Sequence, residues 1–148
     1  CIRDRGTGPN SNVDKDLKPL KIGEANIINE ESSEIVILNF GTLLNEANQI
    51  SKELRATLVD MRFVKPLDEK LLRKLFKKAK VFISIEDGSI MGGAGSAVQE
   101  FTSKENLNVR SILFGIPDKF IEHASREEML VEAGLDVENI KSKLSKLL

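Results

Sequence analysis

Short apolar runs alternate along this chain with longer segments in which apolar residues recur every three or four positions. The runs are rich in β-branched residues and predict strands at 25–29, 35–38, 57–61, 81–85 and 109–114. Helical spacing appears between and after them, at 42–54, 68–79, 95–102, 125–133 and 137–147. Strands that alternate with amphipathic helices are typical of a parallel sheet with right-handed crossovers.

Residues with helix-capping chemistry stand at several of the expected helix ends. Thr42, Asp68 and Asp136 each precede a periodic segment, where a side-chain oxygen accepts a hydrogen bond from a free backbone amide. Gly134 follows the segment at 125–133 and has the freedom of a helix stop. We therefore expect an α/β fold, a three-layer α/β/α sandwich around a mostly parallel sheet of about five strands.

The first 21 residues differ from the rest, because they are polar, contain Gly6, Gly8, Pro9 and Pro19, and lack a periodic apolar pattern. We expect residues 1–21 to form an arm or linker from a preceding domain that is missing here, and residues 22–148 to form one domain. A chain of 148 residues with 41% hydrophobic residues suits one such core.

The composition and charge of the chain argue against some kinds of binding partner. The formal net charge is −1 with the cations spread along the chain, which argues against nucleic-acid binding. No apolar run approaches the roughly 18 residues that cross a bilayer, so we expect no membrane segment. Cys1 is the sole cysteine, which excludes an intrachain disulfide and favours a reducing compartment.

A glycine-rich loop follows the apolar run at 81–85, in the sequence SIEDGSIMGGAGSAV of residues 84–98. A strand, a glycine loop and a helix suit an anion at the helix amino terminus. However, Val98 stands where a dinucleotide fingerprint has its last glycine or alanine, and no GxxxxGK[ST] motif is present. We favour a structural loop, which packs the helix on the sheet or meets a neighbouring domain, over a nucleotide site.

Few other side chains suggest chemistry. Glu86 and Asp87 follow the same strand, but neighbours on an extended chain point to opposite sides, so loop hydrogen bonds or a salt bridge are favoured over a shared proton. Arg62 is expected to pair with Asp60 or another loop rather than to clamp an anion. His123 has no cysteine or second histidine to complete a metal or nucleophile site. We assign no catalytic, metal-binding or cofactor-binding residue to the chain.

Arg5 is the best candidate for a ligand contact. It lies in a segment too polar to be held by packing, next to Gly6 and Gly8. The planar guanidinium suits bidentate phosphate contacts, and glycine allows a phosphate to approach the main chain.

Several long motifs together resemble one family. RGTG at 5–8, ILNFGTL at 37–43, ATLVDMRFVKPLDE at 56–69, IEDGSIMGGAGSAV at 85–98 and GIPDKFIEHASREEML at 115–130 are similar to the C-terminal domain of the 1-deoxy-D-xylulose-5-phosphate synthases, within the transketolase superfamily. The resemblance extends from Arg5 to the terminal helix. It assigns Arg5 to the arginine that binds the substrate phosphate, although Asp4 stands where that family has proline.

The resemblance implies a thiamine diphosphate and Mg²⁺ enzyme that joins pyruvate, with loss of CO₂, to glyceraldehyde 3-phosphate. The product feeds isoprenoid, thiamine and pyridoxal synthesis. The cofactor and the metal would be bound by domains absent from this chain, and this domain would serve dimerisation and active-site closure while being inactive alone. The expected partners are those preceding domains and a second subunit, in the cytoplasm of a bacterium or the plastid of a eukaryote.

Two alternatives stay open at this point. One is the equivalent domain of another superfamily member, such as a transketolase or a 2-oxoacid dehydrogenase β subunit. The other is a free-standing α/β module that binds a nucleotide or another anion through its glycine loop.

Overall fold

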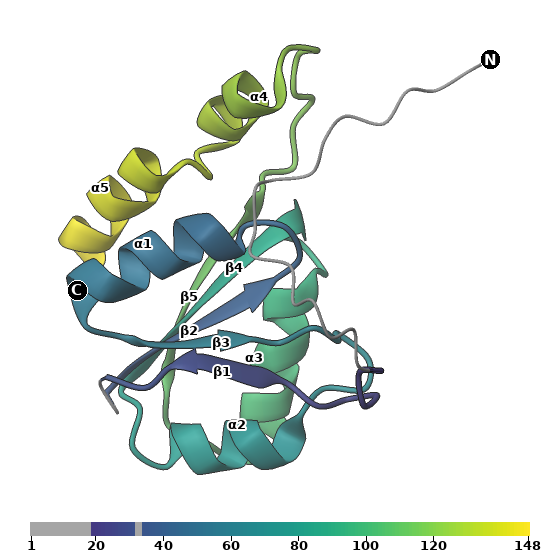
Figure 1. Ribbon diagram of the computed structural model, residues 1–148, viewed down its shortest axis with the longest axis vertical. Coiled ribbons are helices and arrows are strands. Elements are labelled where there is room, and N and C mark those ends of the chain that lie inside the picture. The colour runs from purple at the N-terminus through teal and green to yellow at the C-terminus, as the bar shows by residue number, and fades with distance from the viewer. Residues whose placement is uncertain (1–18, 32–33) are drawn as a thin grey trace.

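The computed structural model describes residues 19–31 and 34–148 (Figure 1). Within these residues one five-stranded sheet has the order β1-β3-β2-β4-β5. Four strands run parallel and β1 pairs antiparallel with β3 at one edge. The strands are β1 (Asn26–Asn29), β2 (Ile35–Phe40), β3 (Thr57–Asp60), β4 (Val81–Ser89) and β5 (Arg110–Ile116).

Helices cover both faces of this sheet, so the predicted three-layer sandwich is confirmed (Figure 1). One face packs against α1 and α5, and the other packs against α2 and α3. The helices are α1 (Leu44–Leu54), α2 (Glu69–Phe76), α3 (Ala94–Lys104), α4 (Arg126–Ala133) and α5 (Val137–Leu147).

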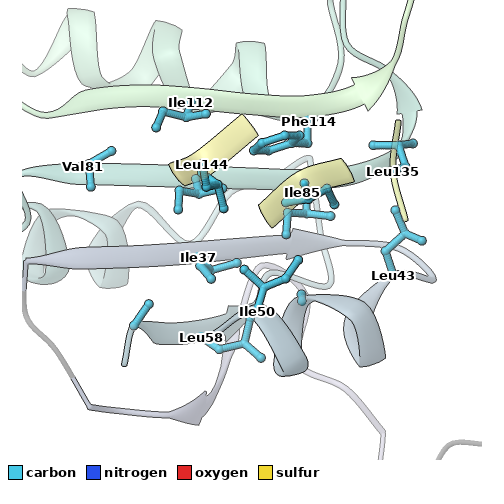
Figure 2. Close-up of a cluster of buried hydrophobic side chains, with 14 of the residues drawn as sticks. Ile37, Leu43, Ile50, Leu58, Val81, Ile85, Ile112, Phe114, Leu135 and Leu144 are labelled. Carbon is cyan, nitrogen blue, oxygen red and sulfur yellow. The ribbon is translucent and has the colours of Figure 1, made fainter. Parts of the chain in front are cut away.

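The central strands are buried on both faces, which explains why they read as unbroken apolar runs. On β2, Ile37 joins the cluster under α1 and α5, whereas Val36 and Leu38 join the cluster under α2 and α3. Figure 2 shows the first cluster, in which Ile50 of α1 lies beside Ile37 of β2, and Leu144 of α5 lies over β4. Successive side chains of a strand point to opposite faces of the sheet, so the same strand contributes to two separate cores.

Most of the predicted helix signals are confirmed. The Asp68 carboxylate accepts a hydrogen bond of 3.0 Å from the Leu71 amide at the start of α2. Asp136 accepts one of 3.3 Å from the Asn139 amide at the start of α5. Gly134 ends α4 with a φ of +70°. These signals act within a few residues, so the sequence alone was sufficient to find them.

The prediction that Thr42 caps the first helix is wrong. Helix α1 begins at Leu44, its N-cap position is Leu43, and no side chain caps it. The Thr42 amide instead donates to Asp87, and the Thr42 hydroxyl accepts from Arg126. Contacts from distant parts of the chain therefore outweighed the local capping preference.

The predicted end of the fourth strand is also wrong. The sequence predicted a strand at 81–85, but β4 continues through both acids to Ser89. The continuation is supported by β5, because Ser89 pairs with Ile116 beyond a register shift that follows Ile85. This extension determines where Glu86 and Asp87 lie.

Candidate functional site at the carboxyl edge of the sheet

The carboxyl ends of β2, β3, β4 and β5 meet at one edge of the sheet, where ligands of open α/β folds usually bind. Glu86 on β4 is only 4% exposed there. Its two carboxylate oxygens accept hydrogen bonds from the first amides of α3, at 2.7 Å from the Ala94 nitrogen and 2.9 Å from the Gly95 nitrogen. The side chain therefore supplies an anion at the amino terminus of α3, where the dipole and the free amides favour negative charge.

The glycines before α3 are needed because Glu86 lies so close. A Cβ on Gly93 would lie 2.1 Å from the Ser89 carbonyl oxygen and 2.4 Å from a Glu86 carboxylate oxygen. A Cβ on Gly95 would lie 2.4 Å from the Ser84 hydroxyl oxygen. The glycine loop thus lets α3 approach β4 closely, which confirms the structural reading of this loop.

This geometry bears on the nucleotide hypothesis. A phosphate at the amino terminus of α3 would need the two amides that already donate to Glu86. The carboxylate would also repel the phosphate, since both are anions in a buried setting. The observation favours a self-contained loop over an external anion site.

Asp87 points to the other side of β4, as expected for its place next to Glu86 on an extended strand. Its carboxylate accepts a 2.8 Å hydrogen bond from the Thr42 amide in the loop after β2. Gly41 in that loop has a φ of +91°, and a Cβ there would lie 2.4 Å from an Asp87 oxygen. The two acids therefore bind separate segments, Glu86 the start of α3 and Asp87 the loop after β2.

Arg126 at the start of α4 adds a third loop to this network. Its guanidinium donates a 3.1 Å hydrogen bond to the Thr42 hydroxyl and lies 3.9 Å from the Glu46 carboxylate. The sequence analysis did not single out Arg126, because its partner Thr42 is 84 residues away and no local pattern connects them. The loop after β2, the end of β4 and the start of α4 are thus joined through Thr42, Asp87 and Arg126.

Arg62 lies after β3 at the same edge. Its Nε is 3.8 Å from the Asp60 carboxylate, so the expected ion pair is confirmed. Arg62 also has a φ of +59°, in the left-handed region that few non-glycine residues adopt. The arginine is thus engaged within its own turn.

The remaining candidates do not complete a site. His123 is exposed in the loop between β5 and α4. Across residues 19–31 and 34–148, no group of three His, Cys, Asp or Glu side chains could hold a metal ion. Arg5 and Cys1 lie outside the described residues, so the phosphate role of Arg5 stays a prediction.

Surface ion pairs and hydrogen bonds account for the clear pKa shifts. Arg73 of α2 donates hydrogen bonds of 2.8 Å to Glu105 and 2.6 Å to Glu69, and its pKa is raised by these two partners. The same contact with Arg73 lowers the pKa of Glu105. Hydrogen bonds from Ser125 lower the pKa of Glu128 in the capping box of α4. Each of these groups has a structural partner on the surface, so none is an isolated acid or base.

No helix in the described part of the chain is long and apolar enough to cross a membrane.

Known proteins resemble this chain in sequence and in fold. The family model described as "Transketolase, C-terminal domain" matches residues 23–140. The 1-deoxy-D-xylulose-5-phosphate synthase of Stutzerimonas stutzeri is 48% identical over 97% of this chain and 23% of its own length. That of Pseudomonas fluorescens Pf-5 is 44% identical over 95% of this chain and 22% of its own length. The chain therefore spans less than a quarter of these relatives.

A solved structure described as "Split gene transketolase, inactive beta4 tetramer" matches with a TM-score of 0.77 and 26% identity, over 86% of this chain and 43% of that one. It agrees with the sequence matches on the kind of domain. The chain belongs to the transketolase C-terminal domain family.

Proposed function

We propose that this chain is the C-terminal domain of a 1-deoxy-D-xylulose-5-phosphate synthase, which joins pyruvate and glyceraldehyde 3-phosphate with loss of CO₂. The observation that carries the proposal is 44–48% identity to such synthases over 93–97% of this chain. Residues 22–148 would be the domain, and residues 1–21 the arm that joins it to the preceding part of the enzyme.

The described residues do not fit thiamine diphosphate or Mg²⁺. The amides at the start of α3 are occupied by Glu86, and the described ranges contain no cluster of metal ligands. A cofactor supplies the carbanion chemistry in such enzymes, while the protein binds and orients it. We therefore assign both groups to the part of the enzyme that this chain does not span.

The role left to this domain is structural support of the active site. Glu86, Asp87 and Arg126 join the segments of the carboxyl edge by hydrogen bonds, and this edge carries the loops that follow four parallel strands. Such an edge is suited to close a site built elsewhere and to meet a second subunit. We place the parent enzyme in the cytoplasm as a homodimer.

The activity is tested with the full-length enzyme, given pyruvate, glyceraldehyde 3-phosphate, thiamine diphosphate and Mg²⁺. We expect release of CO₂ and formation of 1-deoxy-D-xylulose 5-phosphate, and no turnover by residues 1–148 alone. Turnover by the 148-residue chain would contradict the division of roles. The structural match to a transketolase supports a second candidate, transketolase activity. Ketol transfer between sugar phosphates without pyruvate would favour that alternative.

Arg5 provides a separate test of the phosphate role. In the full-length enzyme, Arg5→Ala should raise the KM for glyceraldehyde 3-phosphate much more than the KM for pyruvate, because only the former carries a phosphate. Arg3→Ala is the matched control, since it removes an arginine from the same segment. Equal changes in both KM values would contradict the assignment.

A further inference from the structure

The loop between β5 and α4 presents an aromatic ring to solvent. Phe120 in this loop is 99% exposed. The loop extends past the carboxyl edge of the sheet, at the top of Figure 1. Met91 is 68% exposed in the loop after β4, and the two loops touch at their bases, where the Ile90 amide donates a 3.0 Å hydrogen bond to the Ile116 carbonyl. A phenylalanine that is almost fully exposed suggests a contact residue, because aromatic side chains dominate the energetics of interfaces.

The loop has a defined shape that does not depend on Phe120. On one side of the ring, the Lys119 ammonium donates a 3.2 Å hydrogen bond to the Glu132 carbonyl of α4. On the other side, Ile121 packs against the core. At the end of the loop, Ser125 and Glu128 form a reciprocal capping box. Because the residues on both sides of Phe120 are held in place, the ring is already oriented before binding, which lowers the entropic cost of binding.

We propose that Phe120 is an anchor that inserts into an apolar pocket on the preceding, cofactor-binding part of the same enzyme. This inference rests on the proposed function. The relatives are more than four times as long as this chain, so a large protein surface is available to cover the ring. The ring also lies at the edge that the proposed function turns toward the active site.

The small size of the surface favours an intramolecular partner over a second copy of the domain. A buried aromatic ring contributes about 150–250 Å², whereas a stable interface between separate proteins buries roughly 1,200–2,000 Å². A single ring is therefore too small to hold two chains together. A covalently joined partner has an effective concentration in the millimolar range, at which a small anchor is sufficient.

Photo-crosslinking in the full-length enzyme tests the proposal. A Phe120→p-benzoylphenylalanine variant is first shown to catalyse the proposed reaction, so that failure of the crosslink and failure of the proposed function are separate results. After irradiation, mass spectrometry should find crosslinks to residues that precede this chain. Leu148→p-benzoylphenylalanine is the control, because Leu148 is 53% exposed at the C-terminal end, far from this loop (Figure 1). Crosslinks only within residues 22–148 of either subunit, or a yield no higher than the control, would overturn the proposal.

Hydrogen exchange gives a second measurement. In the full-length enzyme, Phe120→Ala should speed exchange of the amides of residues 117–123 roughly thirtyfold, the change expected from losing a hot-spot aromatic. The variant should still fold, because the ring makes no packing contribution within the domain at 99% exposure. Leu148→Ala should leave those amides unchanged. Equal exchange in the wild type and in Phe120→Ala would show that nothing covers the ring.

Discussion

Glu86 offers the sharpest test of how the carboxyl edge is held together. Glu86→Gln keeps the shape of the side chain but replaces one acceptor oxygen with an NH₂ donor, so one of the two α3 amides loses its partner. A buried unsatisfied group costs about 1–3 kcal/mol. Loss of the negative charge at a helix amino terminus costs a further ~0.3–2 kcal/mol. We expect the free energy of unfolding to fall by about 2–4 kcal/mol in total.

Urea unfolding followed by circular dichroism measures this change in the 148-residue chain. With a slope near 2 kcal/mol per M, the midpoint should fall by about 1–2 M. Asp87→Asn is the matched control, because the new side chain keeps an oxygen that accepts from the Thr42 amide in an exposed setting. Its cost should stay below about 1 kcal/mol. If Glu86→Gln costs no more than Asp87→Asn, the reasoning about the filled helix terminus is refuted.

Three further predictions concern the fold. Gly93→Ala should lower the free energy of unfolding in urea by more than about 3 kcal/mol, because the new Cβ overpacks against backbone. Gly92→Ala has open space but a φ of +68°, and should lower it by about 1–2 kcal/mol. Equal costs would contradict the steric argument. Asp68→Ala should lower the free energy of unfolding by about 1–3 kcal/mol, because the Asp68 carboxylate accepts hydrogen bonds from two backbone amides. Asp68→Asn should recover part of this loss. A thermal midpoint that is unchanged by Asp68→Ala would contradict the role of the carboxylate. Arg73 lowers the pKa of Glu105 below its unfolded value of 4.5, so the ion pair stabilises the fold above pH 4.5, and this stabilisation is lost as the pH falls through the lower folded pKa. Glu105→Gln should therefore lose less stability in acid than the wild type. Identical profiles of stability against pH would count against the pair.

Local patterns predicted most of the architecture. The apolar runs at 35–38 and 81–85 and the helical spacing of Leu71, Leu72 and Leu75 predicted strands and helices that the structure contains. Asp68 and Gly134 were identified as helix signals because each acts on backbone within a few residues. The α/β class and the mostly parallel sheet followed from the alternation of these elements.

Other features needed the tertiary structure. Ala25 to Asn29 was expected as a strand. That its observed part, β1, runs antiparallel at the edge beside β3 depends on pairing between residues 29 to 34 positions apart. The carboxyl end of β4 could not be predicted, because its last residue, Ser89, pairs with Ile116 of β5.

Local signals in the sequence were sufficient to predict most elements of this protein, their order and the family that its motifs resemble, because periodicity, caps and turn residues act within a few residues. The contacts at the carboxyl edge depend on the tertiary structure. Glu86 reaches the amides of residues eight and nine positions later, and Asp87 and Arg126 hold Thr42 from 45 and 84 residues away. Hydrogen bonds between distant segments form only when the sheet brings those segments together, so no local sequence pattern predicts them. The glycine-rich segment that suggested an external anion binds the chain's own Glu86 carboxylate through the amides of Ala94 and Gly95.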